Sequence, residues 1–321
     1  MSAAPLKVAC LGECMIELRP HAPGLLAQGY AGDTYNTAVY LKRLDVTGRL
    51  ELHYATALGG DPFADEMLEA WRAEGVGEGL VRRIPERTTG LYAIRTDATG
   101  ERHFSYWREQ SAARVYLEGA PAPLEACAET IDLLYLSGIT LAVMASALGG
   151  RLEALLERIR AAGGKVAFDN NYRARLWPSA QDARRAFEHA YAHCDIALVT
   201  LDDEAAINPA HAAEAQLARV LALPCTEVVV KRGARPTLVR EAGRAPIELP
   251  VLPVASVVDT TGAGDSFAAG YLTRRLAGAG VEDAVDLGNR LARLVIQHPG
   301  ALVPRAAMGE LLAAERARAA R

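Results

Sequence analysis

The sequence predicts an α/β fold: a doubly wound, mostly parallel sheet flanked by helices, with a small β-sheet lid. Residues Ile131–Leu136 form an apolar run interrupted only by Asp132, which is typical of a strand buried on both faces. From that run onward strand-like and helix-like segments alternate regularly, which favours a parallel sheet covered by helices. Between residues 81 and 107 the segments are short and alternating instead, which indicates an antiparallel hairpin that projects from the main sheet.

The first part of the chain is expected to open with a strand over Lys7–Glu13, an apolar segment bounded by Gly12. Asp33 is the expected N-cap of a helix that runs through Leu44, with apolar residues at helical spacing. A strand follows over His53–Leu58. Pro62–Ala73 then reads as a helix, because proline is favoured in the first turn.

The lid is expected from three short strands, of which the last two are joined by the turn Asp97–Gly100. No internal repeat and no Pro- or Ser-rich linker divides the chain. We therefore expect one domain over residues 1–321, with a lid formed mainly by about residues 80–117 and part of the segment 14–32. The predicted lid strands are Val81–Arg83, Leu91–Thr96 and Arg102–Trp107.

The second part continues the strand–helix alternation. A helix over Ala145–Ala162 is expected to end at Gly163 and Gly164, which suit a C-cap. The later helices are expected over Ala180–His193, Ala212–Ala222, Asp265–Leu276, Val281–His298 and Ala306–Arg318, and the later strands over Lys165–Phe168, Ile196–Thr200 and Glu227–Lys231, with a short hairpin in Thr237–Leu249.

Composition limits the classes of partner. The 321 residues are 50% hydrophobic and 23% charged, which predicts a well-filled core. The formal net charge of −4 argues against a nucleic-acid or anionic-membrane partner, because both favour a basic patch. No apolar stretch is long enough for a bilayer span or a signal peptide, so we expect a cytoplasmic protein. The five cysteines are scattered, which fits buried thiols in a reducing compartment.

The most informative segment is Asp259–Phe267, with the sequence DTTGAGDSF. Gly262 and Gly264 permit a tight turn and a close approach of the backbone to a ligand. The free N–H groups of the helix that follows make an anion site, and donors fixed there would stabilise a phosphoryl group in transfer. Asp265 stands at the same helix start, where a carboxylate can accept a proton.

A purely structural interpretation of that segment stays open, in which the glycines form a turn and Asp265 caps the helix. The sequence motifs of two other kinds of nucleotide-binding site, the P-loop and the Rossmann dinucleotide site, are absent. The chain has no G-x-x-x-x-G-K-[ST] sequence, and no well-formed G-x-G-x-x-G opens a βαβ unit.

Two segments together resemble a known family. Residues 259–271, DTTGAGDSFAAGY, closely resemble the C-terminal signature of the ribokinase-like (PfkB) carbohydrate kinases. Residues 31–36, AGDTYN, are similar to the N-terminal sugar-binding signature Gly-Gly-x-x-x-Asn of that family. Ala31 replaces the usual first glycine, while Gly32 and Asn36 are retained. Two signatures in the right order are far more specific than either one alone.

Further segments, among them GECMIEL, GLYAIRTDATGERHFSYWR and FDNNYRARLW, resemble the 2-keto-3-deoxygluconate kinases of that family. The resemblance implies a ribokinase-like fold, a sugar bound between lid and domain, and ATP with Mg²⁺ as cofactors. It implies phosphorylation of 2-keto-3-deoxy-D-gluconate at the 6-hydroxyl, with a sugar acid and ATP as small-molecule partners. A homo-oligomer is implied as well, because members often pair through their lids.

The resemblance also assigns roles to individual residues. The base of the family corresponds to Asp265, and its anion hole to the backbone of Gly262, Ala263 and Gly264. The implied substrate contacts come from the first signature, the hairpin and the segment after Phe168: Gly32, Asp33, Asn36, Tyr92, Tyr106, Arg108 and Arg173. The implied nucleotide contacts are Asn171, Thr200, Lys231, Gly233 and Asn289.

The implied metal sites are less direct. The family often has Asn-x-x-Glu near its magnesium site, whereas this chain has Leu-Asp-Asp-Glu over residues 201–204. Only Glu204 is retained, and we expect it to act on Mg²⁺ through water. Many relatives bind a monovalent cation such as K⁺ near the residues that correspond to Asp259 and Thr261, and whether this chain binds one stays open.

Arginines support an acidic sugar independently of the resemblance, because the planar guanidinium fork suits a carboxylate. Arg102 and Arg108 lie in or beside the aromatic hairpin, and Arg173 follows a predicted strand. Most arginines are solvated surface charges, so this indication is weaker than the signatures. A fructokinase or another neutral-sugar kinase of the family is the nearest alternative, and a catalytically silent sugar- or nucleotide-binding regulator is the alternative outside enzymes.

Overall fold

The structure is a computed structural model that describes residues 4–22, 24–96, 102–209 and 212–320. The predicted turn at residues 97–100 and the side chain of Arg102 lie outside the described part. Within the described ranges, no helix is long and apolar enough to cross a bilayer, and the cytoplasmic location stays a prediction.

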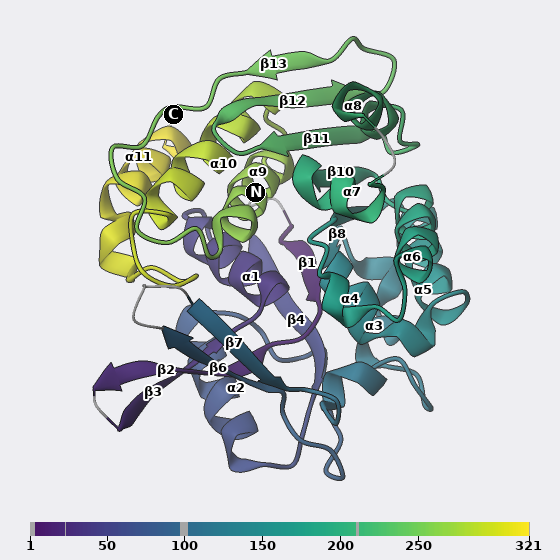
Figure 1. Ribbon diagram of the computed structural model, residues 1–321, viewed down its shortest axis with the longest axis vertical. Helices are drawn as coiled ribbons and strands as arrows, with labels where there is room; N and C mark the ends of the chain where they lie inside the picture. Colours follow the sequence, from purple (N-terminus) through teal and green to yellow (C-terminus); the bar gives the residue numbers. More distant parts are fainter. Residues whose placement is uncertain (1–3, 23, 97–101, 210–211, 321) are drawn as a thin grey trace.

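A nine-stranded sheet forms the centre of the molecule, in the order β13-β12-β11-β10-β9-β8-β1-β4-β5 (Figure 1). The seven strands from β11 to β5 are parallel, and β12 and β13 are added antiparallel at one edge. The strands are β1 (Leu6–Leu11), β4 (Leu50–Leu58), β5 (Val81–Arg83), β8 (Leu133–Ser137), β9 (Lys165–Asp169), β10 (Ile196–Thr200), β11 (Glu227–Arg232), β12 (Arg235–Glu241) and β13 (Ile247–Leu249).

The order of the strands reverses between β1 and β8. The chain builds outward from β1 through β4 to β5, and then outward on the other side from β8 to β11. Loops that leave the carboxyl ends of β1 and β8 therefore diverge and leave a crevice, which is where open α/β sheets bind ligands. The expected doubly wound topology is confirmed by this order.

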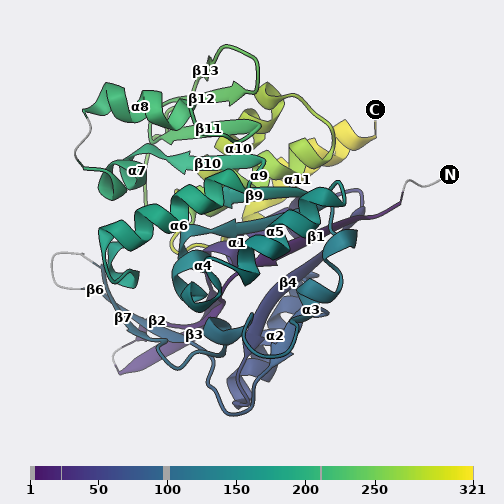
Figure 2. The same ribbon diagram turned by 90° about the vertical axis from the view of Figure 1, so that its right-hand side faces the viewer.

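Helices cover both faces of the sheet, as Figure 2 shows. Alternate residues of β1 enter different cores: Val8 and Cys10 pack with one set of helices, Ala9 and Leu11 with the other. The first set is α1 (Asp33–Leu44), α2 (Pro62–Glu74), α9 (Ala263–Leu276), α10 (Val281–Val295) and α11 (Gly309–Ala319). The second is α3 (Pro123–Ala126), α4 (Gly138–Val143), α5 (Arg151–Ala161), α6 (Ala180–Ala192), α7 (Leu201–Ile207) and α8 (Ala213–Leu221).

A separate four-stranded sheet has the order β3-β2-β6-β7 and stands apart from the large sheet in both views. Its hairpin β6–β7 is the one predicted, with Leu91 paired to Trp107. The prediction that Val81–Arg83 belongs to this sheet is wrong, because β5 pairs in parallel with β4 at Thr56–Leu58. The four strands are β2 (Met15–Ala22), β3 (Leu25–Ala31), β6 (Leu91–Thr96) and β7 (Arg102–Trp107).

Several helix boundaries also differ from the prediction, two of them for a clear local reason. The expected helix over 145–162 is broken: a 3₁₀ turn covers Ala145–Ala147, and α5 begins only at Arg151. Gly149 has φ +75°, and the backbone N–H groups of Gly149 and Gly150 both donate to the Glu153 carboxylate, at 2.8 and 2.7 Å. Asp33 is not an N-cap, since Gly32 holds that position.

Candidate active site

A cavity of about 680 Å³ lies between the small sheet and the carboxyl ends of the large sheet. It is lined by residues that follow β1 and β9, by residues of β6 and β7, and by the first turn of α9. Fifteen residues of the predicted site line it: Gly32, Asp33, Asn36, Tyr92, Tyr106, Arg108, Asn171, Arg173, Thr200, Lys231, Thr261, Gly262, Ala263, Gly264 and Asp265.

The first turn of α9 presents backbone donors to this cavity. Gly262 is the N-cap with φ +77°, and a Cβ there would lie 2.8 Å from the carbonyl oxygen of Ala301. In the described chain, the N–H groups of Gly264 and Asp265 have no acceptor, whereas that of Ala263 donates to the Thr260 carbonyl at 3.2 Å. The positive end of the helix and two free N–H groups therefore face the cavity, as an anion site requires.

Asp265 stands beside these donors. Its carboxylate accepts a hydrogen bond of 2.8 Å from Asn36 Nδ2, and its carbonyl accepts one of 3.2 Å from Thr37 Oγ1. Burial first, and the negative charge of Asp33 second, raise the pKa of the Asp265 carboxyl to about 8, against the opposing effects of Asn36 and Lys231. A carboxyl with this pKa can take up and release a proton near neutral pH, which suits a general base.

A polar network continues from Asp265 along the strand ends. Asp33 accepts a hydrogen bond of 2.7 Å from Asn171 Nδ2, and burial raises the pKa of the Asp33 carboxyl. The backbone N–H of Asn171 donates to Asp169 at 3.2 Å, and Asp169 forms an ion pair of 2.6 Å with Lys231. Three carboxylates and one lysine thus share the floor of the cavity, which is a suitable environment for phosphate and a cation.

The small sheet forms the other wall. The rings of Tyr92 and Tyr106 stack with centroids 5.7 Å apart, and the Tyr92 hydroxyl donates to Glu17. Across the cavity, Oδ1 of the buried Asn36 has no hydrogen-bond partner in the described chain. Aromatic faces and an unused acceptor are the groups that a polyhydroxylated ligand needs.

The arginines of the site differ in their partners. Arg108 is buried and forms an ion pair with the buried Glu13, a pairing that sequence analysis missed. The side chain of Arg173 is 45% exposed and lies 3.8 Å from Asp203. Arg175, also missed, lines the cavity with its guanidinium 3.9 Å from the centre of the Tyr106 ring. Its one sequence signal is its place two residues after Arg173.

Four predicted residues do not line the cavity. Gly233 is in the turn between β11 and β12 with φ +63°, and Asn289 lies on α10 and donates to the Pro250 carbonyl at 3.4 Å. Asp259 accepts a hydrogen bond of 2.7 Å from Thr261 Oγ1 and another from the backbone N–H of Gly300. The roles predicted for these residues stay predictions.

Glu204 is the fourth, and its surroundings do not favour a role at a metal. The side chain is buried, accepts hydrogen bonds from the Tyr191 hydroxyl at 2.8 Å and Asn208 Nδ2 at 3.1 Å, and pairs with Arg219. Asp203, its neighbour in sequence, lines the cavity instead. Within the described part of the chain, no three His, Cys, Asp or Glu residues are grouped as a preformed metal site.

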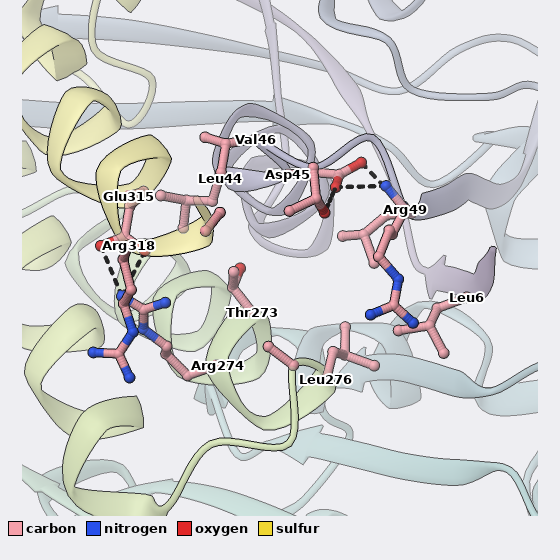
Figure 3. A pocket seen from close by; sticks show the side chains of 14 residues that line it. Leu6, Leu44, Asp45, Val46, Arg49, Thr273, Arg274, Leu276, Glu315 and Arg318 are labelled. Atoms are coloured by element: carbon pink, nitrogen blue, oxygen red, sulfur yellow. Dashed lines mark hydrogen bonds and ion pairs between the residues drawn. The ribbon is translucent and has the colours of Figure 1, made fainter. Parts of the chain in front are cut away.

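A second cavity, of about 250 Å³, lies at the far end of α9 (Figure 3). Among its charged side chains, Glu315 forms an ion pair of 2.6 Å with Arg274, and Asp45 accepts a hydrogen bond of 2.9 Å from the backbone N–H of Arg49. None of the predicted site residues lines it. The larger cavity is therefore the candidate active site.

Comparison with known families decides the class. Residues 5–307 match the pfkB family carbohydrate kinases. The chain belongs to this family. The expected family and fold class are thereby confirmed, and so is the general activity of a carbohydrate kinase.

Relatives within the pfkB family differ in how similar they are. The chain is 46% identical to a 2-dehydro-3-deoxygluconokinase of Escherichia coli (strain K12) over 306 residues, 94% of this chain and 98% of that one. It is 30% identical to a fructokinase of Klebsiella pneumoniae over 86% of each chain. Among solved structures, a PfkB protein from Polaromonas sp. JS666 superposes with a TM-score of 0.80, at 27% identity and over 95% of this chain and 99% of that one.

Proposed function

We propose that this kinase transfers the γ-phosphoryl group of ATP to the 6-hydroxyl of 2-keto-3-deoxy-D-gluconate, giving 2-keto-3-deoxy-6-phosphogluconate and ADP. The observation that carries the proposal is the position of Asp265 beside two free backbone donors, in a cavity that also holds arginines on its sugar side. The relative with 46% identity is named for this substrate, whereas the fructokinase is only 30% identical.

In the proposed reaction Asp265 accepts the proton of the attacking hydroxyl. Asn36 fixes the carboxylate through its 2.8 Å hydrogen bond, so that one oxygen stays directed toward the substrate. The N–H groups of Gly264 and Asp265 and the ammonium of Lys231 would stabilise negative charge on the group in transfer. Tyr92 and Tyr106 would cover the sugar and exclude water.

The residues present fit ATP and Mg²⁺. Gly264 has no Cβ, so a phosphate can approach the backbone beside Lys231, whose Nζ would be 3.6 Å from such a Cβ. Mg²⁺ is usually held by one or two carboxylates together with substrate phosphates and water, and Asp169 and Asp203 line the cavity. Bound there, Mg²⁺ would neutralise charge on the phosphates. We propose these two carboxylates in preference to Glu204.

Three further properties belong to the same proposal. A monovalent cation would bind near Asp259 and Thr261, which is tested by the dependence of kcat on K⁺ against Na⁺. The small sheet, with the adjoining residues up to about 117, would act as a lid on a single domain. Its edge strands expose Leu25, Leu26 and Trp107, which supports a homo-oligomer, tested by light scattering of the purified protein.

The substrate assignment is tested by kcat/KM for 2-keto-3-deoxygluconate and for fructose, with ATP and Mg²⁺ and with ADP release as the readout. A hydrogen bond to a charged group contributes about 1.5–3 kcal/mol, so the acid should be preferred by about 10- to 150-fold. NMR of the product should place the phosphate on the 6-hydroxyl.

Asp265→Asn is the control, since it excludes a contaminating kinase as the source of ADP. A preference for fructose would replace this proposal by a neutral-sugar kinase. If the native protein binds both ligands but releases no ADP, the catalytically silent regulator would replace the kinase as the proposed function.

A further inference from the structure

The charge of Arg108 is already neutralised in the structure. The guanidinium and the Glu13 carboxylate are 6% and 1% exposed, and they join the end of β7 in the small sheet to the loop after β1 in the large one. Removing Glu13 from a buried pair of this kind is costly, because it leaves an unpaired buried charge. A carboxylate that approached Arg108 would also meet the negative charge of Glu13.

The other cationic side chains of the cavity differ in whether a protein carboxylate already pairs with them. Lys231 is paired with Asp169 at 2.6 Å and lies beside Gly264, where the phosphate is proposed to bind. Arg173 is shared with Asp203 at 3.8 Å and donates to the Tyr172 carbonyl at 2.7 Å. Of the described residues that line the cavity, only Arg175 is a cation with no carboxylate at ion-pair distance. On the side of the cavity that the small sheet forms, the uncompensated positive charge is therefore that of Arg175.

Arg175 is also held in place without the loss of its donors. It lies on a 3₁₀ turn, Ala174–Leu176, and its guanidinium carbon is 3.9 Å from the centroid of the Tyr106 ring. Tyr106 stacks in turn on Tyr92, with 5.7 Å between centroids. Contact with a ring face uses the flat side of the guanidinium, so its N–H groups stay free along the edges, where they fit the two oxygens of a carboxylate.

We propose that Arg175, oriented by Tyr106, recognises the carboxylate of the sugar acid together with Arg173, and that it determines the preference for an acid over a neutral sugar. This inference rests on the proposed function, since it presumes an acidic substrate. Because Tyr106 belongs to the small sheet and Arg175 to the large domain, the carboxylate would bind where the two parts meet.

The test compares 2-keto-3-deoxygluconate with 3-deoxyfructose, in which a hydroxymethyl group replaces the carboxylate. Native protein, Arg175→Ala and Arg175→Lys are measured, with Arg185→Ala as the matched control, because Arg185 is an exposed arginine on α6. Both kcat/KM with ATP and Mg²⁺ and the Kd of each sugar by calorimetry without ATP are determined.

Arg175→Ala should weaken binding and use of the acid by about 10- to 150-fold and change those of 3-deoxyfructose by less than about threefold. Arg175→Lys should recover part of the loss, because it restores the charge without the fork. Arg185→Ala should match the native protein.

The outcomes separate the two proposals. A native protein without preference for the acid contradicts the proposed function itself. A native preference that survives in Arg175→Ala overturns only the role of Arg175. Equal losses for both sugars in Arg175→Ala also overturn it, because they would show that the residue merely fastens the small sheet through Tyr106.

Discussion

Asp265 lies in surroundings that favour its protonated form. Its carboxyl faces Asp33 in a largely enclosed site, and together these raise its pKa to about 8, although Asn36 and Lys231 act the other way. A general base gains from a pKa near the working pH, because it is then deprotonated often enough and still basic enough. The same surroundings impose a cost on the fold, since an Asp in the unfolded chain ionises near its usual value of about 3.9.

The sign of that cost can be measured. Between pH 4 and pH 8 the native state binds this proton more firmly than the unfolded state does, so the contribution of Asp265 to stability falls as pH rises. Asp265→Asn removes this titration and keeps an acceptor for Asn36. The free energy of unfolding of Asp265→Asn minus that of the native protein should therefore increase by more than about 1 kcal/mol from pH 5 to pH 8. One pKa unit corresponds to about 1.4 kcal/mol.

Urea denaturation at several pH values checks this expectation. Asp286→Asn is the control, because Asp286 is 62% exposed on α10 and should show no such trend. A pH-independent difference between Asp265→Asn and the native protein would mean that the carboxyl titrates normally in the fold.

Sequence reasoning at the residue scale identified the groups that carry a motif. Asp265, Asn36 and the glycines of α9 stand in two signatures, and all of them line the cavity. Glu13 and Arg175 were missed, because their importance arises from contacts with Arg108 and Tyr106 that are distant in sequence. For Glu204 a short motif suggested a role at a metal. In the structure its carboxylate is buried and instead accepts a hydrogen bond from Tyr191 and pairs with Arg219.

At the scale of elements, the first turn of α9 combines two different demands for glycine. Gly262 has φ +77° and packs against Ala301, so its requirement is conformational and steric. Gly264 is inside the helix, and the nearest atom to a Cβ there would be Lys231 Nζ at 3.6 Å. Its requirement is space for a ligand next to the backbone.

The two alanine variants should therefore fail in different ways. Gly262→Ala should lower stability by about 1–2 kcal/mol, because a residue with a Cβ is strained in this region. Gly264→Ala should fold as well as the native protein but lose about 10-fold or more in kcat/KM, because its methyl group would keep the phosphate away from the backbone N–H groups, and one donor of an anion hole contributes on the order of 10²–10³ in rate. Thermal unfolding and ADP release measure both. Full activity of Gly264→Ala, or an unchanged Tm of Gly262→Ala, would contradict this division.

Predicted elements failed where a local signal was weaker than the tertiary context. The segment 145–162 has a helical pattern, yet Gly149 and Gly150 bind Glu153 through their N–H groups and delay the helix to Arg151. Val81–Arg83 has the alternating pattern expected of a lid strand, yet it pairs in parallel with β4 and so extends the large sheet. Strand pairing of this kind cannot be derived from a three-residue segment.

For the whole molecule, the reversal of strand order between β1 and β8 places the site. Asp169, Thr200 and Lys231 stand at or beside the carboxyl ends of β9, β10 and β11, and the small sheet faces them across the cavity. The alternation of the sequence was enough to predict this topology. It was not enough to specify β2 and β3, for which only a contribution of the segment 14–32 to the lid was expected.

If the small sheet closes over the sugar, its strands should become protected. We expect amide hydrogen exchange in the described parts of β6 and β7 to slow when 2-keto-3-deoxygluconate binds, because closure excludes water from the site. The buried strand β8, Leu133–Ser137, is the internal control and should change little. Equal behaviour of the three strands, with and without sugar, would remove the lid from the proposal.

The most direct test of the central claim, that Asp265 is the base of a sugar kinase, is kcat of Asp265→Asn. Measured with 2-keto-3-deoxygluconate, ATP and Mg²⁺ beside the Kd of both ligands, it should fall by about 10²- to 10⁴-fold while both Kd values change by less than about threefold. A variant that keeps more than about a tenth of the native kcat would contradict the claim.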